Sequence, residues 1–238
     1  MKAPLILTWQ DPTPRAPSHQ MALDEALFHL ATERETAIAR FYTWDAPAVT
    51  LGYFDQMPPG TTEGPEPIRR FTGGGRVEHG DDLTLLLAFP RNAAICDARH
   101  AERYQWIHRQ IADALAEADF PLLLESAPLE SSTGPCFENP VTWDLLEPRG
   151  RKKIGGGAQR RTREGLIHQG SFLLPPALRS LGADWIEDFL LRIADRTEVL
   201  SGEIRAEAET RAETLARERY ASPGWNATSV EERGKNGV

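Results

Sequence analysis

Two glycine runs flanked by basic residues have the residue types and spacing to do chemistry. They read "RRFTGGGRVEHG" (69–80) and "KKIGGGAQRR" (152–161). Glycine lets a ligand approach the main chain closely, and successive free N–H groups can hold an anion. Neither run has the spacing of a Walker phosphate loop or of a dinucleotide fingerprint. Two interpretations stay open: the runs are two walls of one groove, or two tight bends in a sheet.

The second candidate for chemistry is Cys136, in the turn-rich segment "STGPCFENP" (132–140). A free cysteine is most often a small buried hydrophobe, and that interpretation suits Cys96. Cys136 differs because the basic stretch "RGRKKI" (149–154) follows it. A lysine ammonium near a thiol favours the thiolate and so makes a nucleophile. The sequence alone leaves a nucleophilic and a structural Cys136 open.

The composition restricts the class of protein that carries these residues. The chain has 238 residues, a formal net charge of −8, 40% hydrophobic and 26% charged residues, and two cysteines. This length suits one α/β domain, and the acidic balance argues against general nucleic-acid binding. Two cysteines make neither a disulfide framework nor a zinc site, and no apolar run approaches a membrane span. We therefore expect a cytoplasmic protein with no metal site and no nucleic-acid or membrane partner.

Hydrophobic periodicity predicts the elements that must position the candidate residues. Helices are expected over 18–33, 97–120, 185–194 and 202–221, the first with Ser18 as its N-cap and the second with Tyr104 on its inner apolar stripe. Strands are expected over 38–44, 48–54, 83–90, 141–147, 152–162 and 165–175. A turn at 45–47 is expected to join the first two as a pair, and a turn at 163–165 the last two. Strands dispersed among helices, with hairpin-length turns, predict an α/β (α+β) fold with a mixed sheet flanked by helices. We expect one domain over 1–222 and a partly disordered C-terminal tail over 223–238.

Several ordered motifs together resemble the lipoate–protein ligase and octanoyltransferase family. They are "MALDEAL" (21–27), "RRFTGGGRVEHGDDLT" (69–84), "GRKKIGGGAQRR" (150–161), "LIHQGSFLL" (166–174) and "RYASPGWN" (219–226). The resemblance implies the biotin/lipoyl protein ligase catalytic-domain fold, which is similar to class II aminoacyl-tRNA synthetases and biotin synthetases. It also implies protein lipoylation as the activity.

The resemblance assigns expected roles to the glycine runs. In this family they line a narrow tunnel for an octanoyl or lipoyl chain, and the lysine of the second motif, here Lys153, sits at the acyl carbonyl. The glycines would give a flat wall without side chains in the acyl path. The substrate-binding residues implied are Arg70, Thr72, Gly73, Gly74, Gly75, Val77 and His79 from the first motif, Gly156, Gly157, Ala158 and Gln159 from the second, and His168 and Gly170 from the strand that follows.

One segment separates the chemistries that run on this fold. "SSTGPCFENPVTWDLL" (131–146) resembles the cysteine-dependent octanoyltransferases of the Gram-positive type, which place their nucleophile at the position of Cys136. This implies acyl transfer from a carrier thioester, through acyl-Cys136, to a lysine of a lipoyl domain. Lys153 would favour the thiolate and stabilise charge at the carbonyl, and backbone N–H groups near 156–158 would help to hold the oxyanion. Lys153 or His79 would take the proton of the acceptor amine, unless His79 only fixes the glycine loop.

A transferase of this kind would need no cofactor, and we expect the protein to be a monomer. Its donor would be acyl carrier protein or a lipoylated protein, and its acceptor a lipoyl domain or a glycine-cleavage H-type protein. Arg160, Arg161 and Arg163 would meet the acidic surface of such a partner or form a solvated face.

Other functions stay open at this point. An ATP-dependent lipoate–protein ligase, which acts through lipoyl-AMP with ATP and Mg, is favoured by "GGGRV" (73–77), which is closer to the ligase form. Leu85 and "HQG" (168–170) also depart from the usual family pattern. A non-catalytic lipoyl-domain or acyl-binding protein is a further alternative, and a biotin ligase fits the two motifs less well.

Overall fold

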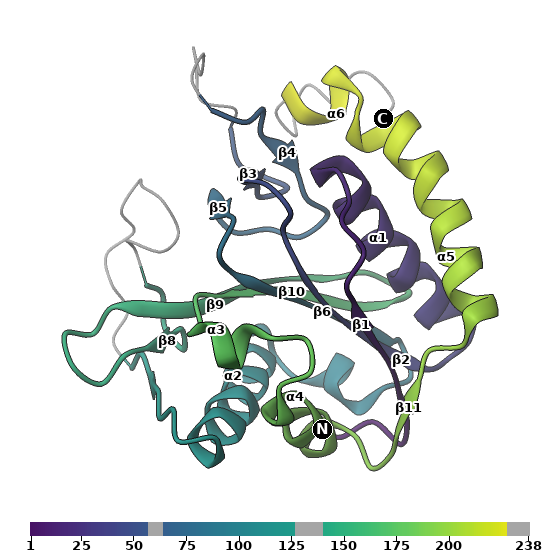
Figure 1. Cartoon of the computed structure of the whole chain (residues 1–238). Helices are drawn as coiled ribbons and strands as arrows, with labels where there is room; N and C mark the ends of the chain where they lie inside the picture. The colour runs from purple at the N-terminus through teal and green to yellow at the C-terminus, as the bar shows by residue number, and fades with distance from the viewer. Residues whose placement is uncertain (57–63, 127–139, 228–238) are drawn as a thin grey trace.

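An eight-stranded mixed sheet with helices on both faces forms the body of the molecule (Figure 1). The computed structural model describes residues 1–56, 64–126 and 140–227. The strand order is β11-β1-β2-β6-β10-β9-β8-β7, in which β1 pairs in parallel with β11 and β2 while the other neighbours are antiparallel. The predicted α/β class with a mixed sheet flanked by helices is confirmed.

The elements of this sheet span most of the described chain. Its strands are β1 (Ile6–Asp11), β2 (Ala37–Thr43), β6 (Leu83–Pro90), β7 (Leu123–Leu124), β8 (Leu145–Leu146), β9 (Lys153–Arg161), β10 (Gly165–Phe172) and β11 (Thr197–Val199). The helices are α1 (Pro17–Glu33), η1 (Ala94–Asp97), α2 (His100–Glu117), α3 (Pro176–Arg179), α4 (Asp184–Ile193), α5 (Gly202–Leu215), η2 (Ala216–Tyr220) and α6 (Pro223–Ala227). None of the helices in these described ranges is long and apolar enough to cross a membrane.

Strand β6 lies in the middle of the sheet and is covered on both faces. All eight of its residues are buried. Leu85, Leu87 and Phe89 pack into the core beneath α2 and α4, whereas Leu86 and Ala88 pack into the core beneath α1 and α5. A strand covered on both faces reads as a continuous apolar run because side chains alternate between the faces.

A second, three-stranded sheet lies beside the large one (Figure 1). Its order is β4-β3-β5, formed by β3 (Ala48–Leu51), β4 (Ile68–Arg69) and β5 (Val77–His79). The loop between β4 and β5 carries the first glycine run. This small sheet places that run against β9, which carries the second run.

Several predicted elements need correction. Strands β2 and β3 are not paired with each other, since β2 joins β6 and β3 joins the small sheet. Helix α1 begins at Pro17 after Ala16, and Ser18 makes no cap. Proline suits the first turn of a helix because its missing N–H has no partner there. The strand expected over 141–147 is reduced to Leu145–Leu146.

The first residues of the expected C-terminal tail, 223–227, are described as helix α6. Helix α6 follows residue 222, and its Trp225 and Asn226 are buried. The fold therefore continues through residue 227, and the remainder of the predicted tail, 228–238, lies outside the described residues.

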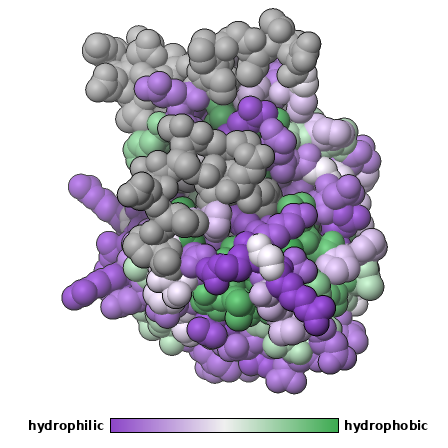
Figure 2. All heavy atoms as spheres, turned by 90° about the vertical axis from the view of Figure 1, so that its left-hand side faces the viewer, coloured by the Kyte–Doolittle hydropathy of each residue, from purple (hydrophilic) through white to green (hydrophobic). Residues whose placement is uncertain are grey.

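The sheet edge formed by β7 and β8 is turned toward the viewer in Figure 2, which shows the left-hand side of Figure 1. An apolar area interrupts a largely hydrophilic surface on this side (Figure 2). Leu123 of β7, at this sheet edge, is an exposed large apolar residue, as is Val141 a few residues before β8.

Candidate active site

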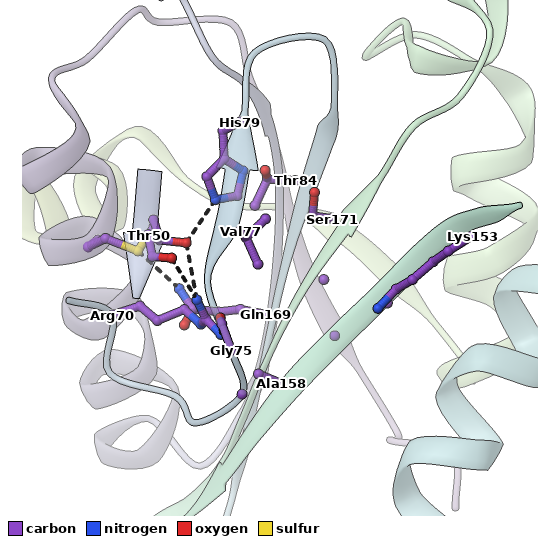
Figure 3. Close-up of a pocket in the computed structure, with 15 residues that line it drawn as sticks. Thr50, Arg70, Gly75, Val77, His79, Thr84, Lys153, Ala158, Gln169 and Ser171 are labelled. Atoms are coloured by element: carbon purple, nitrogen blue, oxygen red, sulfur yellow. Dashed lines mark hydrogen bonds between the residues drawn. The ribbon is translucent and has the colours of Figure 1, made fainter. Parts of the chain in front are cut away.

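A narrow cavity of about 50 Å³ lies where the two glycine runs meet. The small sheet forms one wall, and β9 and β10 form the other (Figure 3). Its lining combines bare backbone with a few polar side chains: Met21, Thr50, Arg70, Gly74, Gly75, Val77, His79, Thr84, Lys153, Gly156, Gly157, Ala158, Gln169, Gly170 and Ser171. The first interpretation of the glycine runs, two walls of one groove, describes this arrangement.

A buried ion pair stands at one end of the cavity. Lys153 lies along β9, on the far side of the cavity from Thr50 and Arg70 (Figure 3). Its ammonium is 2.7 Å from Asp144 Oδ2, and the two side chains are 2% and 0% exposed. A buried ammonium is tolerated when a carboxylate compensates its charge. The pair therefore holds a fixed positive charge beside an otherwise weakly polar channel.

Helix α2 braces the carboxylate of this pair. The Tyr104 hydroxyl donates to Asp144 Oδ1 at 2.5 Å, and the Val141 N–H donates to Asp144 Oδ2 at 2.7 Å. One turn further along α2, His108 Nδ1 lies 2.7 Å from the Trp143 carbonyl oxygen. Burial lowers the pKa of His108 to about 4, so its ring is neutral at pH 7 and donates from Nδ1.

The same tyrosine contacts the backbone that was expected to help hold the oxyanion. Gly157 N–H donates to the Tyr104 hydroxyl oxygen at 2.9 Å, so this amide is not available to an acyl oxygen. Successive N–H groups of a strand point to opposite sides, which turns those of Gly156 and Ala158 toward β10. In this structure Gly157 N–H therefore has the Tyr104 hydroxyl as its partner, and the Lys153 ammonium is a cationic group on the same wall.

The Arg70 side chain holds the backbone of the first glycine run in place. Its guanidinium donates to the carbonyl oxygens of Gly73 and Gly75 at 2.7 and 2.8 Å, and to Thr50 Oγ1 at 3.2 Å. Gly74 has φ +82°, a conformation that favours glycine. A planar fork with several donors suits this task better than a lysine would. Arg70 lines the cavity and also fixes the loop that forms one wall.

Both ring nitrogens of His79 are engaged. Nδ1 is 2.8 Å from Asp82 Oδ2, Nε2 is 2.9 Å from Thr50 Oγ1, and the ring stacks on Trp44 with centroids 4.2 Å apart. Burial alone would raise the pKa of the Asp82 carboxyl, but its contacts with His79 and Ser171 outweigh this and lower it. These contacts give His79 a structural place between Thr50 of β3 and Asp82, and they do not join it to the glycine loop.

A buried polar chain supports the floor of the cavity. The Thr72 hydroxyl donates to Gln169 Oε1 at 2.7 Å, and Gln169 Nε2 donates to Asp24 Oδ2 at 2.6 Å. Arg40 donates to the other oxygen of Asp24 at 2.8 Å. Burial raises the pKa of Asp24, and its contacts with Arg40, Gln169 and Tyr42 offset this only in part. The orientation of the Gln169 amide is fixed because each of its ends has a defined partner.

The glycines of β9 serve the core as well as the cavity. A Cβ at Gly155 would lie 2.3 Å from the Phe172 ring, and one at Gly157 would lie 2.6 Å from the His168 ring. A Cβ at Gly156 would lie 2.8 Å from Lys153 Nζ. The predicted flat wall is therefore only part of the reason for this run, because glycine also leaves room for side chains packed against the strand.

The predicted residues separate into three groups. Lys153 lines the cavity, as do nine of the predicted substrate-binding residues: Arg70, Gly74, Gly75, Val77, His79, Gly156, Gly157, Ala158 and Gly170. Four others lie behind its walls within the described chain: Thr72, Gly73, Gln159 and His168. Cys136 lies outside the described residues, so its distance from Lys153 stays a matter of prediction.

Sequence reasoning missed several lining and supporting residues. Lining residues that were not predicted are Met21, Thr50, Thr84, Gln169 and Ser171. Asp144 was part of the quoted "WDLL" stretch but received no role, and Tyr104 was assigned only to the inner stripe of its helix. Cys96 is buried as expected, and burial raises the pKa of its thiol.

The amino-acid sequence of this chain is similar to that of a known protein family. The model of the lipoyl protein ligase A/B catalytic domain matches residues 16–215. The chain belongs to the lipoyl protein ligase A/B catalytic-domain family. Octanoyltransferase LipM of Oceanobacillus iheyensis is 31% identical over 185 residues, which cover 68% of this chain and 62% of that protein. Octanoyltransferase LipM of Bacillus subtilis is 29% identical over 206 residues, covering 79% and 72%. The chain thus spans about three fifths of the length of the first of these relatives.

Solved structures of the family share the fold. A crystal structure of lipoate-protein ligase A bound with ATP has a TM-score of 0.70 at 20% identity and covers 95% of this chain and 99% of its own. A putative lipoate protein ligase from T. acidophilum with bound lipoic acid has a TM-score of 0.67 at 20% identity, with the same coverage. The predicted lipoate ligase catalytic fold is confirmed by these likenesses.

The C-terminal segment that resembles the family's last motif has a structural place here. Arg69 is fully buried and donates to the carbonyl oxygens of Trp225 and Asn226 at 3.1 and 3.0 Å. Asn226 Oδ1 accepts from the Arg69 N–H at 2.9 Å, and the Trp225 indole donates to the Arg69 carbonyl at 2.9 Å. In this family member the motif "RYASPGWN" therefore clamps β4, immediately before the first glycine run.

Proposed function

We propose that this protein is an acyltransferase of protein lipoylation. It moves an octanoyl or lipoyl group from a carrier thioester, through acyl-Cys136, to a lysine of a lipoyl domain. The observation that carries this proposal is the buried Lys153–Asp144 pair at the end of a narrow cavity lined by bare backbone. An apolar chain fits such a channel, and a fixed ammonium at its end suits a carbonyl on which negative charge develops.

The proposed reaction has two balanced halves. The Cys136 thiolate attacks the thioester carbonyl carbon, the carbonyl electrons move onto the oxygen, and collapse expels the carrier thiolate, which takes up a proton. The neutral ε-amine of the acceptor lysine then attacks the acyl-Cys136 carbonyl. The bond to the Cys136 sulfur breaks, the thiolate returns, and the amine sheds one proton. Lys153 stabilises the oxyanion in both halves.

The relatives support a transferase over a ligase. Eight curated relatives, 28–31% identical to this chain, are named octanoyltransferase LipM. The donor is then acyl carrier protein or a lipoylated protein, the acceptor is a lipoyl domain or H-type protein, and no cofactor takes part. The second candidate is the ATP-dependent ligase, favoured by the first glycine run and requiring ATP and Mg. It would use the same cavity for lipoate and Lys153 for the mixed anhydride.

The test is intact-mass spectrometry after incubation with octanoyl carrier protein in the absence of ATP. The wild-type protein, Cys136→Ala and Cys96→Ala are compared. Cys96 is the matched control because it is the other cysteine of the chain and is a buried residue of η1. We expect one hydroxylamine-labile octanoyl adduct on the wild type and on Cys96→Ala, and none on Cys136→Ala. Acylation of a lipoyl domain by Cys136→Ala once ATP and lipoate are supplied would replace the transferase with the ligase.

A further inference from the structure

We propose that Tyr104 of α2 is a positioning residue for the reaction, because its hydroxyl fixes the carboxylate that holds Lys153. This inference rests on the proposed function for its kinetic consequence, but its structural part is independent of that function. Tyr104 comes from the opposite side of β9 to the small sheet and is only 5% exposed. It touches no proposed substrate atom and acts through Asp144.

The two oxygens of Asp144 have separate partners. Oδ1 accepts from the Tyr104 hydroxyl at 2.5 Å, whereas Oδ2 faces the Lys153 ammonium and the Val141 N–H, each at 2.7 Å. A carboxylate can rotate about its terminal bond, which has broad torsional minima. The Tyr104 bond opposes this rotation, so Oδ2 stays directed at the ammonium. A charge-assisted hydrogen bond of this length is among the stronger ones.

The Tyr104 hydroxyl also connects the Lys153–Asp144 pair to the second glycine run by a hydrogen bond. Its oxygen accepts from Gly157 N–H at 2.9 Å while its hydrogen goes to Asp144. One group therefore sets the separation between the carboxylate and the strand that forms the cavity wall. A Cβ added to Gly156 would lie only 2.8 Å from Lys153 Nζ. The ammonium therefore packs close against the backbone of this strand.

A second contact from α2 keeps the phenol in place. The His108 ring lies 4.0 Å from the Tyr104 ring between centroids, and its Nδ1 donates to the Trp143 carbonyl. Trp143 has φ +74°, an unusual conformation for a bulky residue that precedes Asp144 directly. Tyr104 and His108, one helical turn apart, thus hold the turn and its carboxylate together.

The inference is tested with Tyr104→Phe, which removes one oxygen and keeps the ring. Tyr220→Phe is the matched control, because the Tyr220 hydroxyl also donates to a buried carboxylate, that of Glu25, away from the cavity. The first readout is the NMR signal of the Lys153 ammonium. The chain has four lysines, Lys2, Lys152, Lys153 and Lys235, so Lys153→Arg assigns the signal by its loss. The second readout is the rate of Cys136 octanoylation by octanoyl carrier protein.

We expect Tyr104→Phe to shift or broaden the Lys153 ammonium signal, while Tyr220→Phe leaves it unchanged. We also expect Tyr104→Phe to lower the maximal octanoylation rate by about 10- to 100-fold, as misplacement of a catalytic group does, with the donor concentration at half-maximal rate unchanged. An unchanged ammonium signal in Tyr104→Phe overturns the inference, and so does a wild-type rate. If the wild-type protein forms no acyl adduct, the proposed function fails, whereas the ammonium signal still decides the positioning role.

Discussion

At the scale of single residues, the proposed function depends on the ion pair between Lys153 and Asp144. Both side chains are nearly inaccessible to solvent, and the carboxylate compensates the charge of the ammonium inside the protein. Removing one partner of such a pair leaves an unpaired buried charge, which costs far more than losing an exposed pair. The stability of the fold and the charge at the cavity end are therefore linked through the same two side chains.

Asp144→Asn is predicted to lower the free energy of unfolding by about 3–5 kcal/mol, since it removes the buried carboxylate that lies 2.7 Å from the Lys153 ammonium. Urea unfolding at pH 7 measures this change. Glu198→Gln is the control because its ion pair with Arg196 is open to solvent, with side chains 53% and 67% exposed, and it should cost less than about 1 kcal/mol. Equal effects of the two substitutions would show that the buried pair contributes no more than a surface pair.

The neutral state of His108 predicts a pH dependence of stability. Its pKa of about 4 in the folded protein lies below its ordinary value of about 6.5 in the unfolded chain. Between these values the unfolded state binds more protons, so the free energy of unfolding decreases as the pH falls. The contribution is complete above about pH 6.5 and is lost toward pH 4, by about 3 kcal/mol in total.

Urea unfolding of the wild type and of His108→Gln at pH 7 and pH 4.5 isolates this contribution. The glutamine does not titrate, so the variant should lose less stability between the two pH values than the wild type does. An identical loss in both proteins would mean that His108 is not held neutral by burial.

At the scale of elements, the cavity wall on the side of the small sheet depends on close backbone packing between the end of β3 and the first glycine run. Gly52, directly after β3, shows how close this packing is: a Cβ there would lie 1.7 Å from the Gly74 carbonyl oxygen. Backbone atoms cannot swing aside as a flexible side chain can. The first glycine run is thus held from two sides, by Gly52 and by the guanidinium of Arg70.

Gly52→Ala is predicted to displace the loop 73–75, to destabilise the protein by about 1–3 kcal/mol and to slow Cys136 octanoylation by more than about tenfold. Gly182→Ala is the control, because a Cβ there has nothing within 4 Å, and its effect should stay within about 0.5 kcal/mol. Thermal unfolding and the octanoylation rate are the measurements. A Gly52→Ala protein as active and stable as the Gly182→Ala protein would contradict the close contact.

The sequence predicted those elements whose pattern is local. Helix α1 and strand β6 have long apolar patterns that no distant contact needs to explain. Strand β1 was missed because "ILTWQD" does not alternate cleanly: Asp11 at its end is buried, where it pairs with Arg40 of the next strand and with Arg15. Strands β4, β5 and β7 have two or three residues, which is too short for any period to show.

The candidate site was predictable only where a motif named it. The glycine runs and Lys153 stood out by residue type and spacing. Tyr104 and Gln169 did not, because their partners, Asp144 and Asp24, lie 40 and 145 positions away along the chain. An aromatic residue on the inner stripe of a helix looks the same whether or not its hydroxyl supports a site.

At the scale of the whole molecule, the C-terminal segment and the glycine run before β5 are coupled through Arg69. Asn226→Ala would leave the Arg69 N–H and the Tyr220 carbonyl oxygen buried without these partners, so we predict a loss of about 2 kcal/mol. Thermal unfolding measures this loss. Asn92→Ala, at an exposed position, is the matched control and should have little effect. Equal melting temperatures for the two variants would show that α6 does not support the fold.

One measurement tests acyl transfer through Cys136 directly, and the proposed function depends on this transfer. The octanoyl-enzyme is purified away from donor and ATP and mixed with an apo lipoyl domain, and both masses are followed through a single turnover. We predict that the octanoyl group leaves the enzyme and appears on one lysine of the lipoyl domain at the same rate, and that Lys153→Ala slows this step. An octanoyl group that stays on the enzyme, or that moves only after ATP is added, would contradict the claim.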